Sequence, residues 1–160
     1  MGTNSTNQKR NLFNQLMLIM CTQGKSGLEV VQRVADKENI SVLYFNETNS
    51  LLEYLNQVNR KIILIISGSY CKPIINTLEK NKNISSIVIY CLNVKAILDV
   101  ARKHKKIVSI TTTPNVLEIA LCKAINNFNT AQEMSNISLQ GVDYLALLNY
   151  LNLYNGLLQY

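Results

Sequence analysis

The chain has 160 residues, of which 48% are hydrophobic and 16% are charged, and its net charge is +6. This length supports one domain with a full hydrophobic core and an additional segment. The composition excludes an intrinsically disordered chain and a highly charged one.

Residues 1–12 form a polar segment without periodicity, which predicts a disordered tail. Lys9 and Arg10 precede an apolar run, but polar residues interrupt this run and it is needed as a strand, so we reject a signal peptide. Gly2 lies in the M-G-x-x-x-[ST] pattern of N-myristoylation. The competing interpretation is a polar leader without lipid. One acyl chain beside a basic pair predicts weak, reversible contact with a membrane.

Between residues 15 and 113 one unit repeats five times, a short aliphatic run followed by a stretch with helical spacing. The runs are residues 16–20, 40–45, 61–67, 85–92 and 106–112. They are rich in β-branched residues and apolar on both faces, which is typical of strands buried between two helical layers. Alternating strands and helices predict a parallel sheet with right-handed crossovers.

We therefore predict a three-layer α/β/α flavodoxin-like domain at residues 13–129, with a five-stranded parallel sheet of order 2-1-3-4-5. Its strands should bury seven inward-facing residues, namely Leu18, Val42, Leu64, Ile66, Val88, Ile89 and Val108. The first two helices are expected at residues 26–37 and after the capping-rich residues 46–50. The third is expected to begin near Lys72 and Pro73, the fourth to be capped by Asn93, and the fifth to open at Pro114.

Residues 130–160 are predicted to form a C-terminal helical extension after a polar joint at 129–136. Residues 144–160 contain no charged side chain and show two apolar stripes at helical spacing. One stripe can cover the domain, and the other predicts a partner interface or self-association, formed by Tyr150, Leu153, Leu157 and Tyr160. The alternative is a helix packed wholly on its own core. Three asparagines in this segment argue against a membrane span.

The four cysteines form no CxxC pair, and each lies in or beside an apolar element. This indicates reduced, mostly buried thiols in a cytoplasmic protein. In the predicted strand order Cys21, Cys71 and Cys91 lie near the same edge of the sheet, which allows a soft-metal or redox cluster as an alternative. No histidine accompanies them, so we predict no metal site.

The loop after the third strand contains small residues that let backbone N–H groups approach a ligand. The predicted ligand edge comprises Ser67, Gly68, Ser69, Tyr70, Asn93, Thr112 and Thr113. The competing interpretation is a tight turn between strand and helix. Gln23-Gly24-Lys25-Ser26 is similar to the end of a phosphate-binding loop, but Ile19 stands where that pattern needs glycine. No acid pair or base converges on this edge, so we predict no catalytic residue and no cofactor.

Residues 102–106 form a basic cluster at the predicted end of the fourth helix. Cations there interact favourably with the helix dipole. No aromatic residue is interleaved with them, so we interpret the cluster as a solvated helix end and predict no nucleic-acid partner.

The five βα units resemble the receiver domains of two-component signalling. Receivers carry acids after strand 1, a phospho-accepting Asp after strand 3, Ser or Thr after strand 4 and Lys after strand 5. Here the matching positions are Cys21-Thr22, Ser67-Gly68, Cys91-Leu92 and Thr111-Thr112. The resemblance therefore implies a pseudo-receiver without the catalytic residues.

Residues 63–71 also resemble TIR domains, whose strand of this pattern precedes a Ser/Tyr turn, although the tryptophan of the following TIR helix is absent. Residues 45–55, 64–69 (L-I-I-S-G-S) and 86–91 (S-I-V-I-Y-C) are together similar to an uncharacterised α/β module of multidomain eukaryotic proteins. These likenesses imply a non-catalytic interaction or scaffold module in a cytoplasmic signalling assembly. The alternative is a domain that binds or cleaves a nucleotide or NAD through the loop after the third strand. Contact with membranes is expected only at their surface, if Gly2 is acylated.

Overall fold

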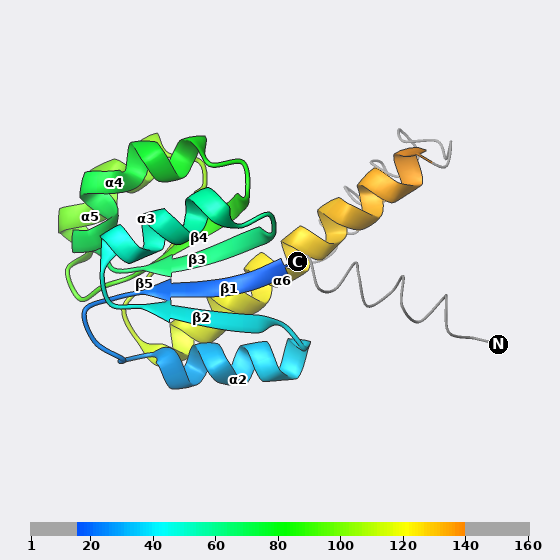
Figure 1. Ribbon diagram of the computed structural model, residues 1–160. Coiled ribbons are helices and arrows are strands. Elements are labelled where there is room, and N and C mark those ends of the chain that lie inside the picture. Colours follow the sequence, from blue (N-terminus) through cyan, green and yellow to red (C-terminus); the bar gives the residue numbers. More distant parts are fainter. Residues whose placement is uncertain (1–15, 140–160) are drawn as a thin grey trace, which may run out of the picture. The chain divides into compact units, whose positions relative to one another are not determined.

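The structure is a computed structural model that describes residues 16–139 (Figure 1). Strands and helices alternate through this part of the chain. The strands are β1 (Leu16–Cys21), β2 (Ser41–Phe45), β3 (Lys61–Ile66), β4 (Ile84–Tyr90) and β5 (Ile107–Thr111). The helices are α2 (Leu28–Glu38), α3 (Thr48–Gln57), α4 (Gly68–Lys80), α5 (Val94–Lys103) and α6 (Pro114–Leu139).

The described strands form one parallel sheet in the order β2-β1-β3-β4-β5, which confirms the predicted order. Leu18 of β1, for example, lies opposite Val42 of β2 and Ile63 of β3. Because the strands run in one direction, their carboxyl ends meet at one edge of the sheet, which we call the C-terminal edge (Figure 1). Their first residues lie at the opposite edge, the strand-start edge.

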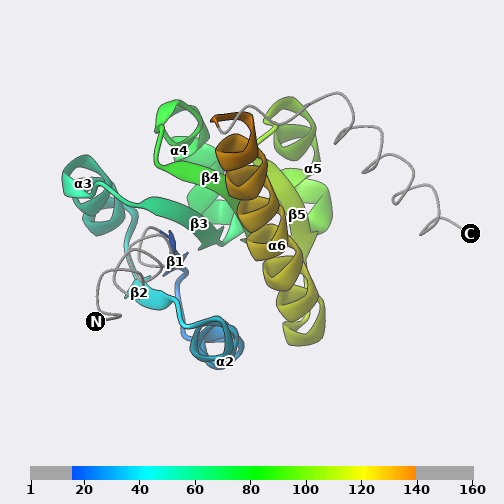
Figure 2. The same cartoon turned by 90° about the vertical axis from the view of Figure 1, so that its right-hand side faces the viewer.

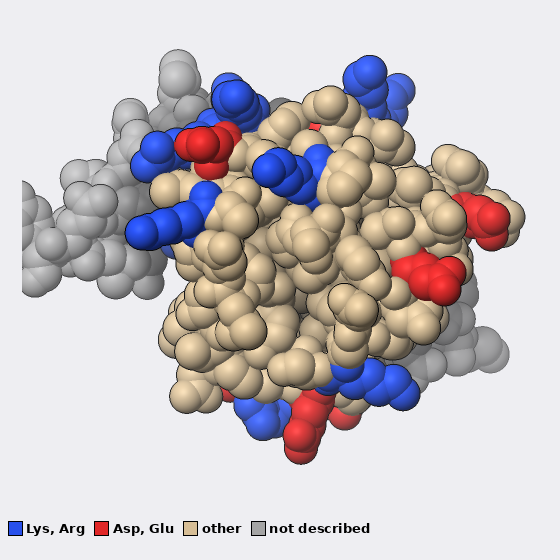
Figure 3. Space-filling view, turned by 90° about the vertical axis from the view of Figure 1, so that its left-hand side faces the viewer, with Lys and Arg blue, Asp and Glu red and all other residues tan. Residues whose placement is uncertain are grey.

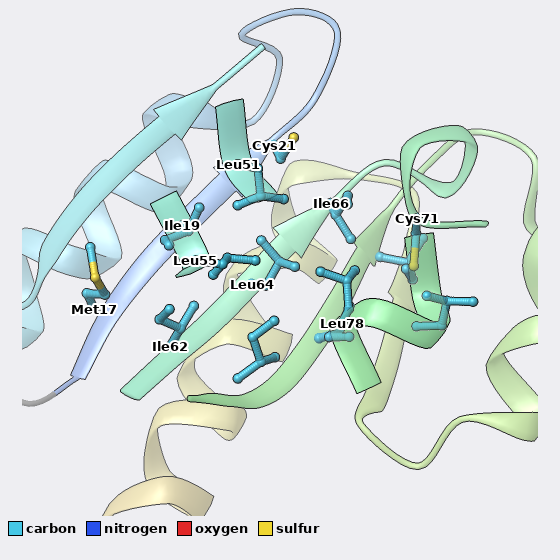
Figure 4. Close-up of a cluster of buried hydrophobic side chains, with 14 of the residues drawn as sticks. Met17, Ile19, Cys21, Leu51, Leu55, Ile62, Leu64, Ile66, Cys71 and Leu78 are labelled. Carbon is cyan, nitrogen blue, oxygen red and sulfur yellow. The ribbon is translucent and has the colours of Figure 1, made fainter. Parts of the chain in front are cut away.

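Helices cover both faces of the sheet, so the predicted three-layer α/β/α architecture is confirmed (Figures 1 and 2). Alternate residues of the strands pack with α3, α4 and α5 on one face. Figure 4 shows this cluster, which includes Met17, Ile19, Cys21, Leu51, Leu55, Ile62, Leu64, Ile66, Cys71 and Leu78. On the other face α2 and the first turns of α6 are joined by an ion pair between Arg33 and Glu118 at 3.0 Å.

Burial follows the position of each strand in the sheet. All six residues of the inner strand β1 are buried. Five of the seven side chains predicted to be buried are so, namely Leu18, Leu64, Ile66, Val88 and Ile89. Val42 is only half-buried because β2 is an edge strand. The prediction for Val108 is wrong, since this residue is 53% exposed.

A β-bulge explains the exposure of Val108. Ile107 lies opposite Ile87 and Ser109 lies opposite Val88, so β5 has one extra residue between these two pairs. A similar irregularity places Ser85 of β4 outside the pairing with β3. The Ser85 hydroxyl donates to the carbonyl oxygen of Ile62 at 3.1 Å, which satisfies that acceptor at the bulge.

Most helix starts agree with the sequence patterns. Asn93 caps α5, since its Oδ1 accepts from the Ala96 N–H at 3.3 Å, and α6 begins at Pro114. The prediction for the third helix is wrong. α4 begins at Gly68, directly after β3, and Pro73 lies inside it rather than at its start.

α6 is longer than the spacing predicted, because the expected polar joint at residues 129–136 is helical. By its contacts the chain divides into two compact units, residues 1–125 and 126–160, so α6 begins in the first unit and ends in the second. Among residues 16–139 no helix has the length and apolar character needed to cross a bilayer.

Candidate functional site

A pocket of about 310 Å³ opens at the C-terminal edge, where β1, β3, β4 and β5 end. Figure 3 shows this face, which is hollowed among uncharged residues and carries its charged side chains toward the rim. The lining residues are Thr22, Gln23, Gly24, Ser26, Ser67, Tyr90, Cys91, Leu92 and Thr112. In open parallel sheets this is the edge at which ligands bind.

The loop after β1 forms one side of the pocket and is fixed by polar contacts. Thr22 Oγ1 donates to the carbonyl oxygen of Gly24 at 2.5 Å, and the Tyr44 hydroxyl donates to the Thr22 carbonyl at 2.9 Å. The Lys25 ammonium lies 6.0 Å from the centroid of the Tyr44 ring. These contacts hold the loop against β2, so Lys25 is placed outside the pocket lining.

The start of α4 forms a second side. The Ser67 N–H donates to the Cys21 carbonyl at 3.2 Å, and the Ser67 carbonyl accepts from the Cys71 N–H at 2.9 Å. The Ser67 hydroxyl oxygen is buried and has no hydrogen-bond partner among residues 16–139. A buried hydroxyl without a partner is costly, and because Ser67 lines the pocket, a rotation about its χ1 would let this hydroxyl meet a group that enters there.

The Cys91 thiol is the one sulfur atom among the lining residues, and its environment does not activate it. Its Sγ donates to the Asn93 carbonyl oxygen at 3.7 Å. Burial raises the pKa of the Cys91 thiol, and the hydrogen bond to the Asn93 backbone opposes this shift. A reactive cysteine needs a lowered pKa, so Cys91 is poorly suited to act as a nucleophile.

Only part of the predicted ligand edge lines the pocket. Ser67 and Thr112 line the pocket, whereas Gly68, Ser69, Tyr70, Asn93 and Thr113 do not. Three of these five have structural roles instead. Asn93 and Thr113 cap helices through their side-chain oxygens, and the Tyr70 hydroxyl donates to the Asn46 carbonyl at 2.9 Å.

The sequence patterns did not identify Thr22, Tyr90 or Leu92 as pocket residues. The strand order contained the information needed, because it places the end of β1 beside that of β3 and so brings the loop after β1 next to Ser67. Tyr90 is the last residue of β4, and its hydroxyl oxygen lies 3.4 Å from that of Ser26 in the loop after β1.

The lining contains no carboxylate, no amine and no imidazole. Among residues 16–139, no three side chains of His, Cys, Asp or Glu come together in a way that could hold a metal ion. The pocket therefore offers hydroxyl, amide and backbone groups that can bind a molecule, without a side chain suited to proton transfer at neutral pH.

The remaining predicted site residues lie outside the described part of the chain. These are Gly2 and the four interface residues Tyr150, Leu153, Leu157 and Tyr160. Lipidation and the C-terminal interface therefore stay predictions.

Sheet order, layers and pocket position define a flavodoxin-like three-layer α/β protein. In comparisons with protein families, curated proteins and solved structures, no family model matches the chain, and no significant match to a protein or a structure is found.

Proposed function

We propose that this chain is a non-catalytic protein-interaction module with a receiver- or TIR-like fold, which acts as a scaffold inside a larger signalling assembly. The observation that carries the proposal is the lining of the pocket at the C-terminal edge. Enzymes with this fold place their reacting groups at that edge. Here the edge presents uncharged hydrogen-bonding groups, which suit recognition rather than bond cleavage.

The positions that correspond to the reacting groups of receivers support the same proposal. Ser67 stands where receivers carry the phospho-accepting Asp, and it begins α4 as its N-cap residue. Thr111 is buried and donates its hydroxyl to the Ile89 carbonyl at 2.8 Å. The Thr111 side chain stabilises the sheet edge, and neither residue offers a carboxylate for phosphorylation.

Leu92 is the residue most suited to contact a partner at this edge. It is 93% exposed, immediately after β4 and on the rim of the pocket. A partner that covers this edge would bury the Leu92 side chain, and the removal of its apolar surface from water would favour association. A second contact through Tyr150, Leu153, Leu157 and Tyr160 remains part of the proposal.

A second candidate function is the binding of a nucleotide or NAD through the loop after β3. One observation favours it, since the unpartnered Ser67 hydroxyl lies at the start of α4, where β1 and β3 end side by side. Helix starts at this place in the fold bind phosphate groups in other proteins.

Thermal unfolding in the presence of NAD, cyclic nucleotides and nucleoside triphosphates separates the two candidates. A ligand present at 100 times its Kd stabilises a protein by about 2.7 kcal/mol, which raises Tm by several degrees. The interaction proposal predicts no shift. A shift that disappears in a Ser67→Ala variant contradicts it and supports the second candidate.

A further inference from the structure

The net charge of this protein is concentrated on one edge of the sheet. Eight cations lie at the connections that lead into β3, β4 and β5, and we call them the basic edge. They are Arg60, Lys61, Lys80, Lys82, Arg102, Lys103, Lys105 and Lys106. The rest of the chain, apart from Glu79, has eight basic and nine acidic residues, so it is nearly neutral.

Parallel topology brings these cations together, although they come from three separate segments of the sequence. The first segment ends the loop before β3, the second ends α4 and the third ends α5, so all three meet at the strand-start edge. Figure 2 looks onto this edge. It is the side opposite the pocket, so the two surfaces are independent.

Hydrogen bonds from side chains to backbone carbonyls fix the loops that carry the charges. Lys61 Nζ donates to the Lys82 carbonyl at 3.0 Å, and Lys106 Nζ donates to the Asn81 carbonyl at 2.6 Å. The Asn83 side chain donates to the Val58 carbonyl at 3.0 Å. These hydrogen bonds therefore hold the segments that carry the cations in place relative to one another.

The positive charge of the basic edge is only weakly compensated. Glu79 is the carboxylate within these segments, and it also lies 3.7 Å from His104 Nδ1. Burial lowers the pKa of Lys106; Glu79 opposes this and the Lys61 ammonium adds to it. The remaining cations Lys80, Lys82, Arg102, Lys103 and Lys105 are exposed.

Helix ends explain part of this arrangement but not all of it. Lys80, Arg102 and Lys103 lie in the last turns of α4 and α5, where the helix dipole favours cations. The other five cations lie outside helices. Of these five, Lys61 and Lys106 are hydrogen-bonded to backbone carbonyls, and Arg60 donates to the Leu16 carbonyl at 3.3 Å. Neither the helix ends nor these contacts account for Lys82 and Lys105, which are exposed.

We propose that the basic edge binds the surface of an anionic lipid bilayer. Mobile anionic headgroups respond to the density of positive charge and require no shaped pocket. The three segments that carry the basic edge contain no Phe, Tyr or Trp on which nucleic-acid bases could stack, and their one histidine, His104, lies beside Glu79.

Co-sedimentation of the unacylated full chain with vesicles tests this proposal. We expect binding to phosphatidylcholine vesicles that contain phosphatidylserine, little binding to phosphatidylcholine alone, and a decrease as salt increases. The variant K82Q/K103Q/K105Q removes three exposed cations of the basic edge. Its partitioning should fall roughly a hundredfold, since each cation near an anionic surface contributes about a fivefold factor.

The matched control is K25Q/K72Q/K95Q, which removes the same charge from three exposed positions away from the basic edge, near the starts of α2, α4 and α5. It should reduce binding by a few-fold at most. Equal losses in the two variants, or binding that does not depend on phosphatidylserine, would overturn the proposal. Retention on single-stranded RNA or poly-glutamate without retention on vesicles would overturn it too and would indicate a polymeric anion. Each outcome leaves the function proposed for the opposite edge unaffected.

Discussion

Gly27 lies between the loop after β1 and the first residue of α2, and its φ of 85° is in the left-handed region. Glycine adopts this conformation without the steric penalty that a Cβ atom brings. A Cβ atom here would also lie 2.9 Å from Tyr90 Cε1 and 3.2 Å from Leu117 Cδ2. Gly27 is therefore required both by the backbone and by the close approach of β4 and α6.

Replacement of Gly27 by alanine should lower the free energy of unfolding by about 1–2 kcal/mol, and by more if the Tyr90 ring cannot move. Urea denaturation measures this change. Gly24→Ala is the matched control, because a Cβ atom at Gly24 meets no atom within 4 Å. A cost at Gly24 as large as that at Gly27 would contradict this account of the loop.

Two cysteine side chains of the core, Cys21 and Cys71, are fully buried. Burial raises the pKa of the Cys21 thiol to about 11 and that of the Cys71 thiol to about 12, because the thiolate is disfavoured there. The folded protein therefore holds these protons more tightly than the unfolded chain does. Their stabilising contribution is complete below the unfolded pKa of about 9.0 and is lost as pH rises through the folded values.

The free energy of unfolding should consequently fall as pH increases from 9 toward 11, by up to about 1.4 kcal/mol per pH unit for each thiol. Urea denaturation at a series of pH values measures the slope. A Cys71→Ala variant should show a smaller slope than the wild-type protein, although it is less stable at neutral pH. Identical slopes would show that the Cys71 thiol does not contribute.

At the scale of elements, β4 and β5 show how a single β-bulge decides whether a side chain is buried or exposed. Val88 is completely buried in β4, whereas Val108, the extra residue of the bulge in β5, is 53% exposed. Both residues are valines in apolar runs of similar pattern. Nothing in those runs marks the bulge, so the prediction failed at Val108 for a reason that only the pairing of the two strands reveals.

Alanine substitutions at these two valines should therefore have different effects. Val88→Ala removes two buried methyl groups and should cost about 2 kcal/mol of stability. Val108→Ala should change stability by less than about 0.5 kcal/mol. Chemical denaturation of the two variants gives the comparison, and similar costs would show that Val108 is packed against other residues.

The helix boundaries show a similar limit of sequence patterns. Pro73 is typical of a first helical turn, yet α4 begins at Gly68, directly after its N-cap residue Ser67, and Pro73 lies in its second turn. The polar residues at 129–136 predicted a joint, but α6 contains no glycine and no proline after Pro114. Asparagine, serine and threonine lower helix propensity only slightly, so the helix continues through them.

For the whole molecule, the apolar runs determined the sheet well, because five alternating strand and helix units leave few possible arrangements of a parallel sheet. The pocket was harder to predict, because it depends on where side chains from four strand ends point. Asn93 and Thr113 have the right chemistry for a ligand edge, but their oxygens cap α5 and α6. Tyr90 reaches the pocket from a strand whose pattern indicated only burial.

The central proposal is that the C-terminal edge, with its uncharged pocket, binds another protein, and Leu92 tests it most directly. Affinity capture from the native source should be compared for the wild-type chain, Leu92→Asp and Val108→Asp. Both substituted residues are exposed, so both variants should remain folded. The proposal predicts proteins that the wild-type chain and the Val108 variant retain and the Leu92 variant loses. Retention of the same proteins by all three chains would contradict it.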